Sequence, residues 1–179
     1  SRSPASDPNV ITLAVFASPT NFDARVATDE VSQKVFQLIY DNLFNLDDNL
    51  RVSPGLATRL EQVDERTYVA HLRQGVRFHD GHELTSQDVV YTFKSILDPA
   101  LRSPFKGAFR SLKDVTALDQ YTVVFTLTEP FAAFPMQLTG VPPIVPADAG
   151  DSLKTFPIGT GPYRFVRYEA DDTLVLSAF

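Results

Sequence analysis

Residues 68–93 read YVAHLRQGVRFHDGHELTSQDVVYTF, and this stretch decides how the chain around it is interpreted. It opens on an alternation in which every second residue of 68–72 points to the same face of a strand. Residues 74–75 interrupt the strand, residues 76–78 resume it, and His79-Asp80-Gly81 turns the chain. The pattern therefore predicts two short strands and a tight turn.

The same stretch then predicts the start of a helix. Thr85 is placed to cap the helix, and Asp88 follows three residues later, where the acidic member of a capping box belongs. Apolar residues continue at helical spacing: Val89, Val90, Phe93 and Ile96. Asp98-Pro99 ends the segment, because the residue before a proline disfavours the helical conformation.

Composition limits the classes of protein to consider. Among the 179 residues, 44% are hydrophobic and 21% are charged, which is ordinary for a globular protein with one good core or two smaller units. The balance of 16 basic against 22 acidic residues argues against a nucleic-acid partner. Cysteine is absent, which excludes disulfides, zinc–thiolate sites and cysteine nucleophiles. No apolar run reaches the length of about 18 residues that spans a membrane.

The rest of the chain is expected to mix short strands with a few helices, a mixed α+β chain of the α/β class. Strands are predicted at 10–16, 43–46, 59–63 paired with 67–72, 112–118 paired with 122–127, and 163–168 paired with 173–179. A helix capped by Thr28 or Asp29 is predicted from Val31, Val35, Leu38 and Ile39, and a short one at 131–138. The sequence stops inside its last predicted strand, so we expect it to be a fragment of a longer protein.

All three histidines lie in or beside the opening stretch, which raises the question of a metal site. His71, His79 and His82 have Asp80 and Glu83 nearby. However, His79 and His82 belong to a turn, and no helical His-Glu-x-x-His pair occurs. We therefore expect a structural turn in which Asp80 accepts hydrogen bonds from local backbone N–H groups and Gly81 supplies a positive φ.

Other candidate chemistry also has a structural explanation. Gly159-Thr160-Gly161 lacks the lysine and the following helix of a phosphate-binding loop, which favours a tight turn before a strand. The acid pairs at 47–48, 64–65 and 171–172 all lie in predicted hairpin turns, and no nucleophile motif is present. Four phenylalanines beside prolines either pack in the core or line a small-ligand pocket: Phe105, Phe109, Phe131 and Phe134.

Several motifs in one order resemble the periplasmic solute-binding proteins of ABC importers, in the peptide, dipeptide and nickel class (family 5). Residues 35–98 carry most of them, including PGLA at 54–57, LRQGVRFHDG at 72–81 and SQDVVY at 86–91, and PIGTGPY follows at 157–163. The similarity extends from about residue 10 to residue 179. Leu60 and Ala70 depart from the usual aromatic residues and are interpreted as packing changes.

The resemblance implies a lobe of the periplasmic-binding-protein type with a smaller α+β subdomain inserted in it. Residues 1–41 and 151–179 would form part of the main lobe, and residues 42–150 the inserted subdomain. Family members are longer, so the second lobe, which carries the opposite wall of the ligand cleft, is expected to be absent from this sequence.

The resemblance also implies where the ligand binds. The backbone of Val26, Ala27, Thr28 and Asp29 would bind a peptide in the manner of an added strand. Phe105 occupies the position of a cleft aromatic residue, but it cannot donate the hydrogen bond that a tyrosine would. The nickel-binding branch has arginines near residues 140–143, and none is present there, which disfavours nickel.

The function implied is that of a non-enzymatic binding component that captures a peptide or a similar solute for the permease subunits of an ABC importer. We expect a monomer outside the cytoplasm, in the periplasm or lipid-anchored, with no metal, cofactor or catalytic residue. Alternatives left open are a binding protein for a nickel chelate, haem, glutathione or a sugar. An α+β hydrolase using His79 and Asp80, and a purely structural or receptor-interaction module, are the contrasting classes.

Overall fold

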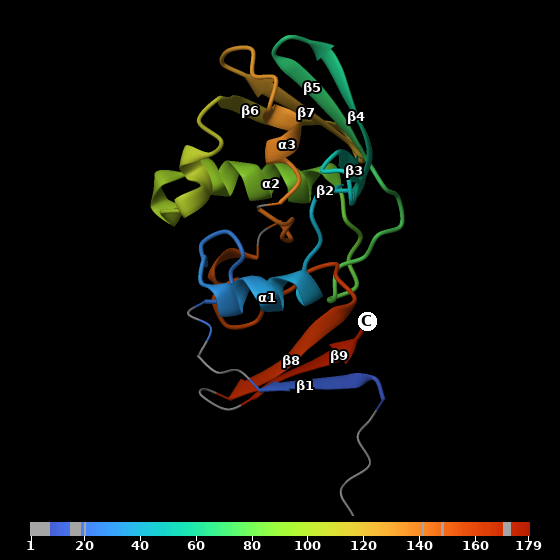
Figure 1. Ribbon diagram of the computed structural model, residues 1–179, viewed down its shortest axis with the longest axis vertical. Coiled ribbons are helices and arrows are strands. Elements are labelled where there is room, and N and C mark those ends of the chain that lie inside the picture. The colour runs from blue at the N-terminus through green and yellow to red at the C-terminus, as the bar shows by residue number, and fades with distance from the viewer. Residues whose placement is uncertain (1–7, 15–18, 20, 141, 148, 170–172) are drawn as a thin grey trace, which may run out of the picture.

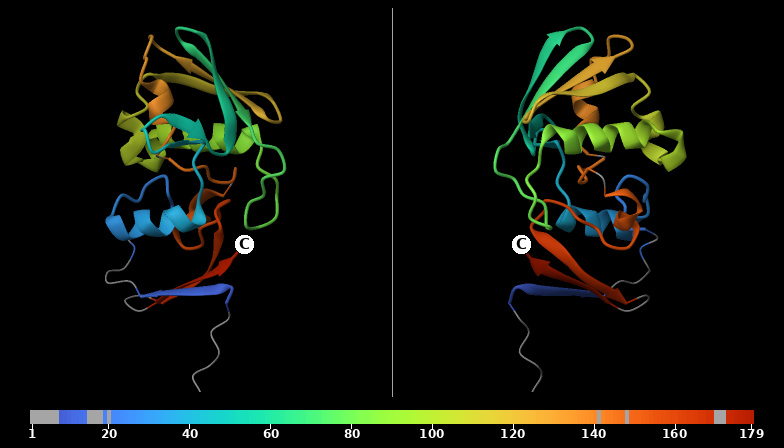
Figure 2. Two further views of the ribbon diagram at one scale, coloured as in Figure 1. Left: turned by 45° about the vertical axis from the view of Figure 1, so that its right-hand side comes forward. Right: turned by 180° about the vertical axis from the view of Figure 1, so that it is seen from behind.

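The computed structural model describes residues 8–14, 19, 21–140, 142–147, 149–169 and 173–179. In Figure 1 a four-stranded sheet with helix α2 lies above a three-stranded sheet with helix α1, and the two turned views in Figure 2 show the same arrangement. This mixture confirms the predicted fold class. The predictions that fall on Val15, Phe16, Val141 and Asp171-Asp172 lie outside the described residues.

The upper sheet contains both hairpins predicted for the middle of the chain. Its antiparallel strands lie in the order β4 (Ala57–Asp64), β5 (Thr67–Leu72), β7 (Thr122–Leu127) and β6 (Leu112–Asp119). Along β5, Tyr68, Ala70 and Leu72 are buried and the residues between them are half-buried. The predicted alternation of residues 68–72 is therefore confirmed.

Helix α2 (Ser86–Leu97) packs against the upper sheet and begins at its predicted cap. The hydroxyl of Thr85 accepts a hydrogen bond from the Gln87 N–H at 3.3 Å, and the carboxylate of Asp88 accepts one from the Thr85 N–H at 2.8 Å. The Thr85 side chain also meets the backbone N–H of Asp88, which completes a capping box with the Asp88 carboxylate. Val89, Phe93 and Ile96 are buried, and Asp98 ends the helix before the 3-10 helix Pro99–Leu101.

The lower sheet is covered by helix α1 (Glu30–Ile39), whose predicted cap is Asp29. The Ser32 N–H donates to the Asp29 carboxylate at 2.9 Å, which satisfies one of the free donors of the first turn. The three antiparallel strands lie in the order β1 (Val10–Ala14), β9 (Thr173–Ala178) and β8 (Tyr163–Glu169). The first strand and the last hairpin of the sequence thus belong to one sheet.

The buried side chains form two clusters. The upper cluster takes its members from residues 43–144, and the lower one combines residues 22–40 with Val145, Leu153 and strands β8 and β9. The clusters support the predicted division into 1–41 with 151–179 and 42–150, which we propose as the domain organisation. Because Val145 is fully buried in the lower cluster, we place the return boundary just after Ile144 rather than at residue 150.

Three local features differ from the predictions or were left without a predicted range. Residues 76–78 form no strand: the Leu84 N–H bonds to the Val76 carbonyl and the Phe78 N–H to the His82 carbonyl, so the segment bonds to its own turn. The second strand of the hairpin predicted around residues 47–48, for which no range was predicted, is β3 (Val52–Pro54), paired with β2 (Phe44–Leu46). Helix α3 covers only Phe134–Gln137, because Pro135 is tolerated in a first turn but not in a helix interior.

Candidate functional site

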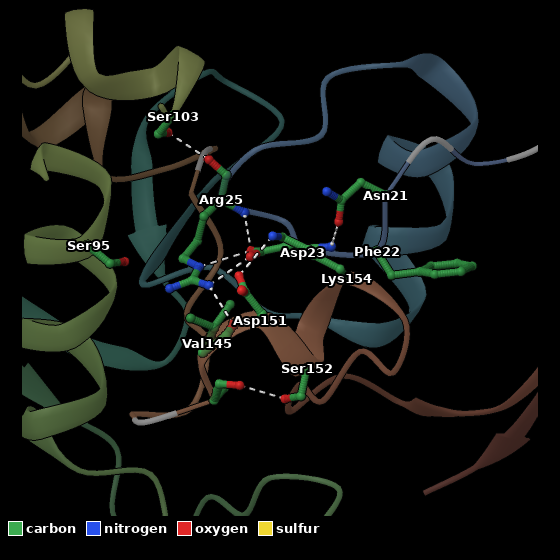
Figure 3. A network of polar contacts seen from close by, with 12 residues as sticks. Asn21, Phe22, Asp23, Arg25, Ser95, Ser103, Val145, Asp151, Ser152 and Lys154 are labelled. Carbon is green, nitrogen blue, oxygen red and sulfur yellow. Dashed lines mark hydrogen bonds and ion pairs between the residues drawn. The ribbon is translucent and has the colours of Figure 1, made fainter. Parts of the chain in front are cut away.

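The two loops predicted to contact a ligand lie side by side. The Ser103 hydroxyl donates a hydrogen bond of 2.6 Å to the backbone carbonyl of Arg25, although the two residues are 78 positions apart (Figure 3). The same hydroxyl accepts the Phe105 N–H at 3.2 Å, at the start of a 3-10 helix, Pro104–Gly107. Phe105 itself is half-buried against the upper cluster. Ser103 therefore joins the segment before α1 to the loop after α2.

The segment before α1 is a turn followed by extended residues. The N–H groups of Val26 and Ala27 both donate to the Asp23 carbonyl at 3.1 Å, and the Gln33 side chain binds the Ala27 carbonyl at 2.9 Å. Thr28 is exposed, and its main chain makes no hydrogen bond with the described part of the chain. Asp29 is extended, with φ −67° and ψ 150°. If a peptide adds as a strand along residues 26–29, as predicted, the backbone N–H and carbonyl groups that remain available to it are those of Thr28.

A buried ion pair holds this turn. Asp23 and Arg25 are 0% and 2% exposed, and the Arg25 Nε and Nη2 atoms donate to the two Asp23 carboxylate oxygens at 2.9 and 2.7 Å (Figure 3). The Arg25 N–H also donates to the Asp23 carboxylate at 3.0 Å. Paired, bidentate geometry of this kind offsets the large cost of taking both charges out of water.

Arg25 extends this contact to two other segments. Its Nη1 donates to the Tyr91 hydroxyl of α2 at 3.1 Å, and its Nη2 donates to the Gly150 carbonyl at 3.0 Å. Burial lowers the pKa of Arg25, but its hydrogen bonds and charge interactions with Asp23 and Tyr91 more than compensate, so the pKa is raised and the guanidinium stays charged. One side chain thus fixes the turn, α2 and the return of the chain relative to each other.

Sequence analysis missed this pair. The available signal was the Asp-x-Arg spacing inside the apolar run Phe22-Asp23-Ala24-Arg25-Val26-Ala27. Two opposite charges surrounded by apolar residues are seldom solvated, since charged residues are almost never fully buried unless paired. The partners Tyr91 and Gly150 could not be found from the sequence, because they lie 66 and 125 positions away from Arg25.

His79 lies at the contact between the upper and lower halves. Its backbone N–H donates to the Gly159 carbonyl at 2.9 Å, its Nδ1 accepts the Gly159 N–H at 3.3 Å, and its Nε2 is 2.9 Å from the Gly161 carbonyl. Because a carbonyl only accepts, Nε2 carries the proton and the ring is neutral. Burial lowers the pKa of His79, in agreement with this state. With both nitrogens engaged, the ring is not free to act as the base of a hydrolase.

The chain bends at residues 160–162 before β8, in agreement with the predicted turn, but the two glycines are not there to supply a positive φ. Neither Gly159 nor Gly161 has a positive φ. A Cβ on Gly159 would lie 2.1 Å from the Ile39 carbonyl oxygen, and one on Gly161 would lie 2.7 Å from the Leu38 oxygen. The glycines are thus required because the C-terminal end of α1 lies directly against them.

The other histidines do not converge with His79. His71 lies on β5 with its Nε2 3.0 Å from the Arg59 guanidinium, and His82 stacks on Phe78 and meets Asp80 at 2.7 Å. As predicted, the Asp80 carboxylate accepts a backbone N–H, that of His82, and Gly81 has a φ of 94°. In the described ranges, no group of three or more His, Cys, Asp or Glu residues could hold a metal ion.

In the described part of the chain, four surface hollows have linings that include neither residues 26–29 nor Phe105. Among the predicted contact residues, Thr28 is exposed, Val26, Asp29 and Phe105 are half-buried, and Ala27 is buried in the lower cluster. We call the accessible part of this set, Val26, Thr28, Asp29 and Phe105, the open wall. Such a wall buries a ligand only when another surface closes over it.

Comparison with known proteins identifies this architecture. The family model described as bacterial extracellular solute-binding proteins, family 5 (middle) matches residues 51–179. The chain belongs to this family. The predicted resemblance is confirmed, and the family consists of extracellular solute-binding proteins rather than enzymes.

Curated relatives agree with the family model. The oligopeptide-binding protein AppA of Bacillus subtilis is 27% identical, with 94% of this chain and 33% of the relative covered. The glutathione-binding protein GsiB of Pectobacterium atrosepticum is 31% identical, with 93% and 34% covered. The chain therefore spans about a third of the length of the curated relatives it matches.

Solved structures of family members have the same fold. The AppA structure, in complex with a nonapeptide, superposes with a TM-score of 0.83 at 27% identity and covers 92% of this chain and 35% of that chain. The DppA structure from Helicobacter pylori, in complex with the peptide STSA, gives 0.81 at 30% identity, covering 91% and 38%. Within the described residues, none of the helices has both the length and the apolar content needed to span a membrane.

Proposed function

We propose that this chain is part of the extracytoplasmic binding component of an ABC importer, which captures a peptide or a solute of similar size. The observation that carries the proposal is the superposition of 92% of the chain on a family member solved with a nonapeptide. The permease subunits of the importer are the proposed partners. The protein would act as a monomer in the periplasm or at the outer face of the membrane, free or lipid-anchored.

The geometry of the two loops supports the proposal. The Asp23–Arg25 pair and the Ser103 hydrogen bond hold residues 26–29 beside the Phe105 loop through contacts within the chain itself. Such preorganisation reduces the ordering cost of binding. The main chain of Thr28 offers a donor and an acceptor to an extended peptide, and Phe105 offers an aromatic surface. Val26, Ala27, Thr28, Asp29 and Phe105 remain the proposed ligand contacts.

The test uses the native, full-length protein purified without unfolding. Mass spectrometry of the ligand that co-purifies should identify a peptide, and calorimetric titration with peptides of two to nine residues should give saturable binding. Hydrolysis products should be absent after prolonged incubation. If no peptide of this range binds and a sugar, haem or a nickel–histidine chelate does, the assignment to peptides is wrong. Turnover of any bound peptide would instead contradict the non-enzymatic function.

A second candidate solute is glutathione, because a relative at 31% identity is named for binding it. Glutathione is a modified tripeptide, so the same wall could bind it through its backbone. The two candidates are separated by competition. Glutathione that displaces a bound nonapeptide only at a large excess would favour the peptide, and tighter binding of glutathione than of any peptide would favour glutathione.

A further inference from the structure

The loop after α2 carries positive charge in a chain that is acidic as a whole. Residues 99–113 contain four basic residues and no acidic one, whereas the complete sequence has a net charge of −6. The four are Arg102, Lys106, Arg110 and Lys113, all of them exposed. In the described part of the chain, none of the four forms an ion pair, although Arg110 lines one hollow with Glu129. A local excess of one sign of charge raises the local concentration of solutes of the opposite sign.

Two of these charges lie at the open wall. Arg102 directly precedes Ser103, whose hydroxyl bonds to the Arg25 carbonyl in the segment before α1, and Lys106 directly follows Phe105. In all three views of Figures 1 and 2 the loop after α2 lies above that segment. Consecutive Cα atoms are about 3.8 Å apart, so each charge lies within roughly one screening length of the wall, about 10 Å at moderate salt.

The acidic groups beside the wall already have partners. Asp23 is paired with Arg25 at 2.7 Å, and Glu30 with Lys34 at 2.6 Å. The Asp29 carboxylate caps α1, where it accepts hydrogen bonds of 2.9 and 2.7 Å and lies at the positive end of the helix dipole. Among the described residues, the two cations of the loop are therefore the charges at the wall that remain available to a ligand.

Arg102 has a backbone conformation that a glycine adopts more easily. Its φ and ψ are 54° and 38°, in the left-handed region, and Leu50 is the other described non-glycine residue with a positive φ. Glycine makes such a turn without strain, so the geometry of the turn does not by itself explain an arginine at this position. Strained residues of this kind cluster at functional sites. The side chain of Arg102, rather than its backbone, is therefore the feature that calls for a function.

We propose that the loop after α2 makes the binding component selective for acidic solutes. A carboxylate of the ligand lies at Arg102 and Lys106, while its main chain meets Thr28 and its apolar part meets Phe105. Peptides with acidic side chains belong to this class, as does glutathione with its two carboxylates, and basic peptides are disfavoured. Each exposed charge pair changes affinity by a factor of about two to five, and charges at the rim act mainly on the rate of association. This selectivity rests on the transport proposal, since it names the class of solute captured at the same wall.

The probes are three alanine-based nonapeptides that differ only in carrying evenly spaced glutamate, glutamine or lysine residues. Each is titrated by calorimetry into the native full-length protein at low and at high salt, and glutathione is compared with its diethyl ester in the same way. At low salt the glutamate peptide should bind at least about fivefold more tightly than the glutamine peptide, and the lysine peptide more weakly than both. High salt should reduce this preference, because it screens exposed charges.

Variants of the two cations test whether they cause the preference. In Arg102→Gln and in Lys106→Gln, the ratio of the glutamine-peptide to the glutamate-peptide dissociation constant should fall by about two- to fivefold, and in the double variant the ratio should approach one. Arg102→Gly removes the charge together with the strained backbone, so it should lose the same preference and melt no lower than the wild type.

The matched control is Arg66→Gln, which removes an exposed cation from the turn between β4 and β5, at the top of Figure 1 and away from the loop after α2. It should keep the full preference for glutamate. Equal affinities of the three nonapeptides for the wild type would overturn the acidic selectivity and leave the transport proposal intact. A preference that persists in the double variant would also overturn it, by placing the selecting charge elsewhere. If neither the nonapeptides nor either form of glutathione binds, the transport proposal fails as well.

Discussion

The Asp23–Arg25 pair makes one residue-scale prediction. Replacing Arg25 by methionine keeps most of the side-chain volume but leaves the Asp23 carboxylate buried and unpaired. Removing one partner of a buried pair typically costs about 3–5 kcal/mol. We expect the free energy of unfolding, measured by urea titration, to fall by that amount. The double variant Asp23→Asn with Arg25→Met should recover part of the loss, because no unpaired charge remains.

The exposed pair Glu30–Lys34 on α1 supplies the control. Its atoms are as close as those of the buried pair, 2.6 against 2.7 Å, but both side chains are at least 71% exposed. Lys34→Met should therefore leave the free energy of unfolding almost unchanged, because solvent screens an exposed pair. If Arg25→Met and Lys34→Met lower the free energy of unfolding equally, burial of the Asp23–Arg25 pair is not the reason for its contribution to stability.

His79 predicts a dependence of stability on pH. Burial, the largest influence, lowers its pKa, and the nearby charge of Arg164 acts in the same direction against the hydrogen bond to Gly161 and the charges of Asp41 and Asp80. As the pH falls, His79 therefore takes up a proton at a higher pH in the unfolded chain than in the folded protein. The contribution to stability is complete above the unfolded pKa of about 6.5 and is lost as the pH falls below it.

Urea unfolding at pH values from 8 to 5 measures this effect. We expect the free energy of unfolding of wild type to fall faster below pH 6.5 than that of His79→Gln, in which the group is absent. A His82→Gln variant should retain the steeper fall, because His82 does not touch the Gly159–Gly161 segment. If the free energy of unfolding depends on pH in the same way in wild type and His79→Gln, the ring of His79 is not held neutral by its two hydrogen bonds.

Phe105 separates binding from stability at the residue scale. It is half-buried at the margin of the upper cluster, so Phe105→Ala should cost less than the 3–5 kcal/mol or so of a fully buried phenylalanine. In the full-length protein it should nevertheless weaken peptide binding about tenfold or more, as measured by calorimetry. The fully buried Phe109 is the comparison, and Phe109→Ala should act mainly on stability. A collapsed fold with unchanged affinity would make Phe105 a core residue instead.

At the scale of elements, the close contact between α1 and the Gly159–Gly161 segment predicts that the stability of the fold depends strongly on having glycine at position 159. Gly159→Ala would place a methyl group 2.1 Å from the Ile39 oxygen, so helix and segment have to separate. We expect a loss of at least about 2 kcal/mol in the free energy of unfolding. Gly140→Ala is the matched control, because nothing lies within 4 Å of the added methyl group there. Similar values for the two variants would show that this contact is easily relaxed.

The same contact shows which elements the sequence could predict. Strand β5, the α2 capping box and both hairpins of the upper sheet were predicted because their signals are local: a period of two, a cap and a turn. The strand predicted at residues 76–78 is not formed, and the sequence did not reveal why position 159 requires glycine, because the contacts that decide both features leave no local pattern. The first bonds to its own turn, and the second is constrained by Ile39, 120 positions earlier. The spacing of residue types along the chain does not predict contacts of this kind.

At the scale of the whole molecule, the candidate site was predictable only through the family motifs. Residues 26–29 and Phe105 carry no chemical signature of their own, and the resemblance pointed to them. The bonds that bring them together, Ser103 to Arg25 and Arg25 to Tyr91, cross between the lower and upper halves and were not foreseen. Within the opening stretch 68–93, the turn fastens the upper half to the Gly159–Gly161 segment through His79.

The open wall at residues 26–29 and Phe105 leads to a prediction for the molecule as a whole. A ligand bound only to this wall leaves its other side in water, and the favourable area buried does not repay the loss of translational and rotational freedom. Residues 1–179 alone should therefore bind a nonapeptide at least about a hundredfold more weakly than the full-length protein, measured by calorimetry on both. Circular dichroism of the 179-residue chain verifies that it is folded in the titration. Equal affinities would show that this wall suffices, and that closure by a second surface contributes nothing to capture.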